Sequence, residues 1–130
     1  MANKVIAIIG VGSNIEPEVN VKRAESAICE ITEIIGKSTF AYTKPLKFQD
    51  QPDFLNGAFL ISTKMGLDEL ITKLKEIEIQ LGRTKTENKD GPRTIDLDVV
   101  FYDNKIVDDE VFKRDFLKKA VLELLPNLIL

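Results

Sequence analysis

The 130-residue sequence has no histidine, no tryptophan and a single cysteine, Cys29. Without histidine there is no Ser–His triad, no imidazole zinc site and no ordinary general base near neutral pH. One cysteine excludes an internal disulfide and a cysteine-rich zinc site, and it suits a reducing cytosol. We expect Cys29, which falls within a helical pattern, to be a small core residue. Chemistry must therefore depend on carboxylates, lysine, arginine or a bound metal ion.

The sequence also lacks a long apolar run and an excess of positive charge. No stretch approaches the roughly 20 apolar residues that cross a bilayer, and residues 4–10 are too short for a signal peptide. The net charge of -3 argues against nucleic acid as the main partner. We expect one cytoplasmic domain spanning residues 1–130, with no membrane partner and with an oligomeric state that the sequence leaves open.

Hydrophobic periodicity predicts alternating strands and helices. Strands are predicted at residues 5–9, 38–42, 55–63, 95–101 and 105–107, and helices at 17–35, 67–81 and 116–125. Gly36 and Gly82 are expected to end the first two helices, and Asp103-Asn104 to form a hairpin turn. The order of the main elements predicts an α+β, ferredoxin-like (split βαβ) sandwich, a mainly antiparallel sheet with helices packed on one face.

Two aspartates stand out in the predicted strand at residues 95–101. Asp96 and Asp98 project together from one face because side chains alternate along a strand. The other face carries the apolar residues Ile95, Leu97, Val99 and Phe101. Adjacent carboxylates repel each other unless positive charge lies between them, and either Arg93 or a divalent cation such as Mg²⁺ could supply it. Taken alone, the pattern fits a solvated acidic face equally well.

The segment before this strand is rich in basic residues: Arg83, Lys85, Lys89 and Arg93. Cations beside a metal-binding carboxylate pair could enclose a polyphosphate and exclude water. The alternative is a solvated loop in which Glu87 and Asp90 balance the charge.

Four motifs carry a more specific signal: GSN at 12–14, QDQPDFLN at 49–56, Glu78 with Gly82-Arg83, and GPRTIDLD at 91–98. This set, in this order, closely resembles the 6-hydroxymethyl-7,8-dihydropterin pyrophosphokinase family of folate biosynthesis over nearly the whole chain. The resemblance implies a ferredoxin-like fold and transfer of pyrophosphate from ATP to the hydroxymethyl group of a reduced pterin, releasing AMP. It also implies two Mg²⁺ ions.

The resemblance assigns roles to individual residues. It implies that Asp96 and Asp98 bind the metal ions and form the catalytic set with Arg83 and Arg93. It implies that the pterin is held by Thr43, Pro45, Leu46, Phe54, Asn56 and Phe116, with two rings stacking on it. It places the ATP contacts at Glu78, Lys85, Lys89, Arg93, Val99, Lys113 and Arg114. By itself, Phe54 would be interpreted as core packing at a strand start.

The C-terminal part departs from the family pattern. Members usually carry a Pro-His segment whose histidine contacts the ATP phosphates, and this chain resembles a short variant that lacks it. Lys113 and Arg114 are the nearest cations that could replace that contact. The alternative function is a catalytically weakened or inactive pterin-binding relative with a binding or regulatory role.

Overall fold

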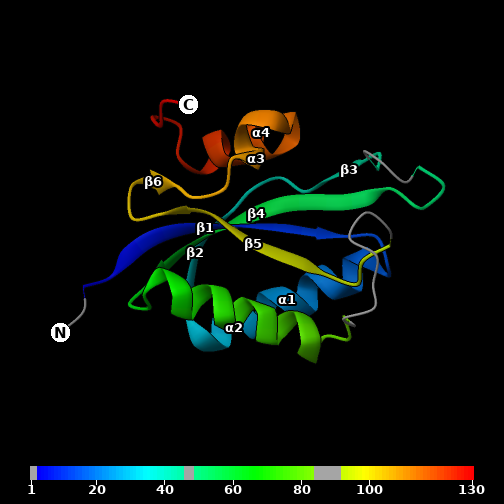
Figure 1. The fold of residues 1–130 in the computed structure, drawn as a ribbon, viewed down its shortest axis with the longest axis horizontal. Coiled ribbons are helices and arrows are strands. Elements are labelled where there is room, and N and C mark those ends of the chain that lie inside the picture. Colours follow the sequence, from blue (N-terminus) through cyan, green and yellow to red (C-terminus); the bar gives the residue numbers. More distant parts are fainter. Residues whose placement is uncertain (1–2, 46–48, 84–91) are drawn as a thin grey trace.

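A computed structural model describes residues 3–45, 49–83 and 92–130 (Figure 1). The elements are β1 (Val5–Ser13), α1 (Pro17–Ile31), β2 (Glu33–Lys37), β3 (Ala41–Thr43), β4 (Phe54–Thr63), α2 (Leu67–Gln80), β5 (Asp96–Tyr102), β6 (Lys105–Ile106), α3 (Glu110–Lys113) and α4 (Asp115–Leu124). The sheet order is β2-β4-β1-β5-β6, β3 also pairs with β4, and these pairings are antiparallel. The ferredoxin-like α+β class is therefore confirmed.

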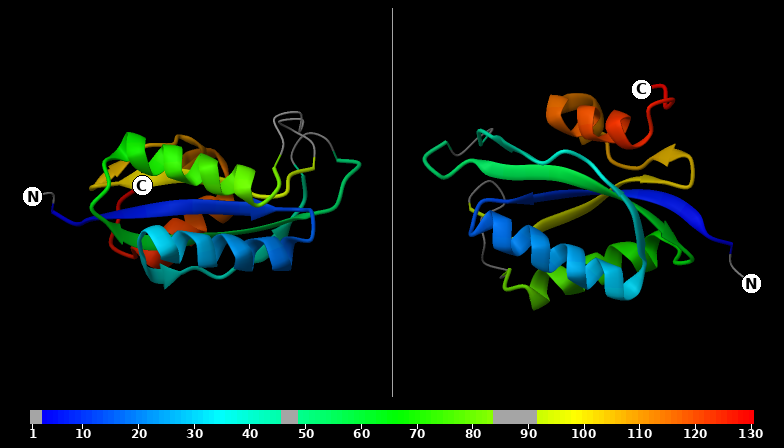
Figure 2. Two further views of the ribbon diagram at one scale, coloured as in Figure 1. Left: turned by 90° about the horizontal axis from the view of Figure 1, so that it is seen from below. Right: turned by 180° about the vertical axis from the view of Figure 1, so that it is seen from behind.

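Helices cover both faces of the sheet. Figures 1 and 2 show α1 and α2 on one side and α3 and α4 on the other, so the expectation of helices on one face was wrong for the C-terminal part. The cause is that each face carries its own apolar core, and α4 buries Leu117 and Val121 against Ile8 and Ala58. Within the described ranges, no helix is long and apolar enough to cross a membrane.

A β-bulge changes which face Phe101 occupies. Ile8 pairs with Phe101 and Ile9 with Val99, so Val100 is an extra residue in β5. Such an insertion shifts the alternation by one position. Phe101 therefore packs in the core beneath α4, and its predicted place on the same face as Val99 was wrong.

The first helix ends earlier than the periodicity predicted. Its C-cap is Thr32, whose extended backbone leads into β2 and whose hydroxyl donates to the Ser62 carbonyl at 2.6 Å. Gly36 is therefore a strand residue and not a helix end, and the strand predicted at 38–42 is replaced by β2 and β3. The β-branched residues Thr32, Ile34 and Ile35 favour extended backbone once a partner strand is available.

Cys29 is exposed, so its predicted place in the core was wrong. It follows Ile28, whose side chain is buried beneath the sheet. Consecutive helix residues point in directions about 100° apart, and the buried stripe of α1 is narrow enough to leave Cys29 outside it.

The predicted helix end at Gly82 and the predicted hairpin turn at Asp103-Asn104 are confirmed. Gly82 follows α2 with φ of 109°, a conformation that glycine adopts without a steric penalty. Asp103 and Asn104 both have positive φ, at 47° and 68°, and join β5 to β6 as a tight hairpin.

Gly57 in β4 is required by close packing. A Cβ atom there would overlap the ring of Phe40, which also packs against Phe59 with ring centroids 5.6 Å apart. Gly57→Ala should therefore reduce the free energy of unfolding by about 1–3 kcal/mol, measured by urea denaturation. Gly66→Ala is the matched control because nothing lies within 4 Å of its Cβ position. Equal losses in the two variants would contradict this packing argument.

Candidate active site

A cleft of about 750 Å³ lies on the sheet face that α3 and α4 partly cover. Most residues that the sequence marked as functional line it: Thr43, Pro45, Phe54, Asn56, Arg83, Arg93, Asp96, Asp98, Lys113, Arg114 and Phe116. They come from β3, β4 and β5, from the end of α3 and the start of α4, and from the loops next to these elements. The fold thus gathers segments that are far apart in the sequence into one concave site.

Two other predicted residues do not line this cleft, and three lie outside the described residues. Glu78 is 4% exposed and lies beneath the cleft floor. Val99 packs in the core between the sheet, α1 and α2. Leu46, Lys85 and Lys89 lie outside the described residues.

The floor of the cleft is opened by two glycines in β1, whose packing role the sequence analysis did not identify. Gly10 and Gly12 line the cleft, and a Cβ on Gly12 would lie 2.8 Å from the Asn56 side-chain oxygen. Asn56 in turn donates to the Thr43 hydroxyl at 2.5 Å. Gly12 therefore leaves room for a polar pair that joins β3 to β4. The available signal was two glycines spaced by two residues inside a strand.

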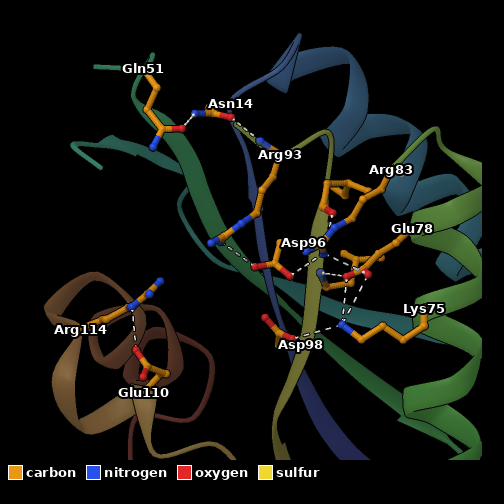
Figure 3. Close-up of polar contacts among 12 residues, drawn as sticks. Asn14, Gln51, Lys75, Glu78, Arg83, Arg93, Asp96, Asp98, Glu110 and Arg114 are labelled. Atoms are coloured by element: carbon orange, nitrogen blue, oxygen red, sulfur yellow. Dashed lines mark hydrogen bonds and ion pairs between the residues drawn. The ribbon is translucent and has the colours of Figure 1, made fainter. Parts of the chain in front are cut away.

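Asp96 lies between two arginines (Figure 3). Arg83 Nη1 is 3.1 Å from Oδ1, and Arg93 Nη1 is 3.2 Å from Oδ2. The Arg93 guanidinium also lies over the Phe54 ring, 5.7 Å from its centroid. Phe54 thus lines the cleft and contacts the Arg93 guanidinium. The predicted counter-charge role of Arg93 matches this geometry.

Glu78 connects α2 to the active-site strand. Its carboxylate accepts the Leu97 N–H at 2.7 Å, and its Oε1 lies 3.1 Å from Arg83 Nη1. Burial raises the pKa of Glu78, whereas the Leu97 hydrogen bond and the charges of Lys75 and Arg83 act in the opposite direction. Glu78 therefore fixes the position of Arg83 from below and does not itself face the cleft.

Asp98 carries the least neutralised carboxylate of the cleft floor. Its side chain is half-exposed, and its nearest described cation is Lys75, with Nζ 3.7 Å from Oδ1. Partial burial, followed by repulsion from Asp96, raises the pKa of Asp98 from 3.8 to about 7, although Lys75 opposes this shift. Sequence reasoning missed Lys75; its only signal was a spacing of three from Glu78 on one side of α2.

Asn14 ties two loops together at the edge of the cleft. Its side-chain oxygen accepts the Arg93 N–H at 2.8 Å. Its side-chain nitrogen donates to Gln51 Oε1 at 2.8 Å and to the Pro52 carbonyl at 2.9 Å. Asn14 is 4% exposed, so these bonds satisfy a buried amide. The motif at 12–14 was recognised, but this role depends on contacts across the fold.

Arg114 and Phe116 line the opposite wall. Arg114 Nε lies 2.9 Å from Glu110 Oε2, one helical turn earlier, and Figure 3 shows this pair across from the β5 aspartates. Phe116 packs partly against the apolar core beneath α4 and partly lines the cleft. Together with Lys113, this wall therefore presents two cations and one ring toward the site.

The carboxylate pair has the right chemistry for a hard divalent cation. Asp96 and Asp98 offer oxygen ligands on a rigid strand, and the described residues contain no group of three or more possible ligands. Mg²⁺ is commonly held by one or two carboxylates, with water and substrate phosphates completing its coordination. The two aspartates could hold such an ion at the cleft floor.

The structure defines an α+β protein of the ferredoxin-like fold with a carboxylate and arginine cluster in an open cleft. The chain belongs to the family described as 7,8-dihydro-6-hydroxymethylpterin-pyrophosphokinase, which it matches over residues 8–126. The family resemblance found in the sequence is therefore confirmed.

Individual relatives agree with this assignment. The chain is 32% identical to the 2-amino-4-hydroxy-6-hydroxymethyldihydropteridine pyrophosphokinase of Haemophilus influenzae, over 97% of this chain and 85% of the relative. It is also 32% identical to the Aquifex aeolicus protein of that name, over 93% and 81%. A folic acid synthesis protein of Schizosaccharomyces pombe is 35% identical over 95% of this chain, which spans only 18% of that longer protein.

The raised pKa of Asp98 predicts a pH-dependent stability. Between pH 3.8 and about 7, the folded chain binds more protons at Asp98 than the unfolded chain does. The free energy of unfolding should therefore decrease as pH rises through this window. Asp98→Asn, which cannot ionise, should lose this part of the slope, so its stability relative to the parent should increase with pH.

Urea denaturation at about pH 5 and about pH 8, without divalent cations, measures this difference. Asp68→Asn is the control, since Asp68 is exposed in the first turn of α2 and does not line the cleft. Parallel pH profiles for the parent and Asp98→Asn would show that the pKa of Asp98 is not raised.

Proposed function

We propose that this chain catalyses Mg²⁺-dependent transfer of pyrophosphate from ATP to 6-hydroxymethyl-7,8-dihydropterin, releasing AMP, as a step of folate biosynthesis. Family membership and the names of the bacterial relatives support this reaction. The observation that carries it is the cleft itself, where the carboxylate pair Asp96 and Asp98 lies beside Arg83 and Arg93, and which two aromatic rings also line. A polyphosphate and a flat heterocycle would both be accommodated there.

The pterin end of the cleft would be formed by β3, β4 and the start of α4. Phe54 and Phe116 line the cleft and would stack on the pterin, which is favourable for a flat ligand. Asn56 and Thr43 supply hydrogen-bonding groups that would fix its orientation. Pro45 lines the same end.

The phosphate end would be formed by the arginines around Asp96. Arg83 and Arg93 are already oriented by Glu78, Asp96 and Asn14, so little ordering is needed when phosphate charge arrives. Bound Mg²⁺ would add charge neutralisation and a template for phosphate oxygens. The residues of the two ends of the cleft would hold the pterin hydroxyl in line with the β-phosphorus of ATP. The hydroxyl oxygen would then bond to this phosphorus and lose its proton, while the oxygen that bridges the α- and β-phosphates leaves with AMP.

A pterin-binding relative without turnover is the second candidate. It is favoured by the absence of histidine and by the ion pair that engages Arg114 with Glu110. In that case the rings would still bind a pterin, whereas the nucleotide would be held weakly.

Turnover tests the proposal directly, by following AMP release from ATP with the reduced pterin and Mg²⁺. We expect AMP formation that depends on both substrates. We expect Asp98→Ala to abolish it in a variant that still folds and unfolds cooperatively, because a half-exposed carboxylate is not required for the fold. Pterin binding without AMP release by the parent would favour the second candidate. Activity retained in folded Asp98→Ala would contradict the metal-binding role.

Arg114 is proposed as the cation that replaces the missing histidine. Arg114→Ala should raise the dissociation constant of Mg-ATP by roughly tenfold or more, because a charge-assisted hydrogen bond to phosphate is lost. Pterin affinity should remain within about twofold. Lys118→Ala is the control, since it removes the same charge from an exposed site on α4 outside the cleft. Unchanged Mg-ATP affinity in Arg114→Ala would exclude this role.

A further inference from the structure

We propose that Lys75 is a resident counter-cation of Asp98, which neutralises this carboxylate in the ligand-free chain and competes with a divalent cation for it. The inference rests on the proposed function, in which Asp96 and Asp98 hold the metal. It assigns to the half-exposed Lys75 the role of balancing the charge of Asp98.

The geometry places Lys75 between two carboxylates. Its Nζ lies 3.7 Å from Asp98 Oδ1 and 3.4 Å from each oxygen of Glu78. Figure 3 shows the side chain extending from α2 toward both groups. The Asp98 contact is a loose ion pair and not a hydrogen bond, because a donor–acceptor distance of 3.7 Å is too long. Lys75 is therefore attracted to Asp98 but not fixed there.

Glu78 gives Lys75 an alternative partner. The Glu78 side chain is 5% exposed and is held by Leu97 and Arg83, so it keeps its position when Lys75 moves. The side chain of Lys75 is 50% exposed and long enough to change rotamer within the cleft. Leaving Asp98 thus breaks one contact while the ion pair to Glu78 remains.

The charges of the cluster explain the competition. Glu78, Asp96 and Asp98 are balanced by Lys75, Arg83 and Arg93. When all three carboxylates are ionised the set is neutral, and a divalent cation added to it meets repulsion from the Lys75 ammonium group next to Asp98. Without the charge of Lys75 the set is negative, and the two aspartates would attract the cation more strongly. At an effective dielectric constant near 20, one charge a few ångströms away changes affinity by about tenfold or more.

Titration with Mn²⁺ alone, followed by its electron paramagnetic resonance signal, tests this proposal, because Mn²⁺ shares the oxygen-ligand preference of Mg²⁺. Lys75→Met keeps an unbranched side chain of nearly the same length and removes its charge, and it should bind Mn²⁺ about tenfold or more tightly than the parent. Lys75→Arg keeps the charge and should remain within about twofold. Lys75→Gln provides a second uncharged variant should Lys75→Met fold poorly.

Lys73→Met is the matched control for net charge. Lys73 lies two residues earlier on α2, pairs with Glu76 at 3.7 Å and does not line the cleft. Its Mn²⁺ affinity should stay within about twofold of the parent. The proposal is overturned if Lys75→Met binds no more tightly than the parent, if it binds no Mn²⁺, or if Lys73→Met gains as much affinity.

The titration contains neither nucleotide nor pterin, so its result is separate from the test of the proposed function. Tighter Mn²⁺ binding by Lys75→Met without turnover by the parent would support the role of Lys75 and contradict the reaction. Turnover by the parent with unchanged Mn²⁺ affinity in Lys75→Met would support the reaction and overturn the role of Lys75.

Discussion

The contact between Glu78 and the backbone of β5 holds together the charge cluster of the cleft. This cluster consists of Lys75, Glu78, Arg83, Arg93, Asp96 and Asp98. Removing a carboxylate from water costs several kcal/mol unless hydrogen bonds and opposite charges replace the lost hydration. Glu78 receives the Leu97 N–H at 2.7 Å and lies beside Arg83 and Lys75. A single buried group thereby sets the spacing between α2 and β5 and orients two cations toward the cleft.

The two faces of the sheet divide the tasks of stability and binding. The face beneath α1 and α2 is fully packed, with Ile9, Phe59 and Leu97 in its core. On the other face α4 buries only one end of the sheet, and the remaining area of β1, β4 and β5 forms the cleft. Asp96 and Asp98 lie on this uncovered area because they alternate with residues that the first core holds in place. Packing on one face therefore fixes the direction of the functional groups on the other.

Local patterns were sufficient for the elements whose neighbours agree with them. The strict alternation of β5 predicted that Asp96 and Asp98 share a face, and the periodicity of α2 predicted its bounds to within one residue of Leu67–Gln80. The end of α1 was misjudged because Ile31 and Ile35 fit a helical stripe as well as a strand. Pairing with β4 decides between the two, and that pairing joins residues far apart in the sequence.

The bulge at Val100 and the hydrogen bonds around Asn14 both depend on contacts between segments that are far apart in the sequence. A bulge is a property of two paired strands, so no pattern within β5 alone predicts that Phe101 changes face. The amide of Asn14 joins Arg93 to Gln51 and Pro52 across the fold. The motifs identified which residues carry the chemistry, whereas the contacts that orient them required the tertiary structure.

Three species would compete for the carboxylate of Asp98: a proton, the Lys75 ammonium group and a divalent cation. Binding of the proton is favoured because partial burial and repulsion from Asp96 raise the pKa of Asp98 to about 7. The Lys75 ammonium group is close but loosely held, with Nζ 3.7 Å from Asp98 Oδ1. A divalent cation adds two charges and would displace both, since binding of the metal requires the ionised carboxylate. Under the proposed function, the carboxylate of Asp98 would contribute both to the response of the cleft to pH near neutrality and to its response to metal. Metal binding would release a proton in part of this range, and a polyphosphate that brings its own negative charge would ease the repulsion between the cation and Lys75.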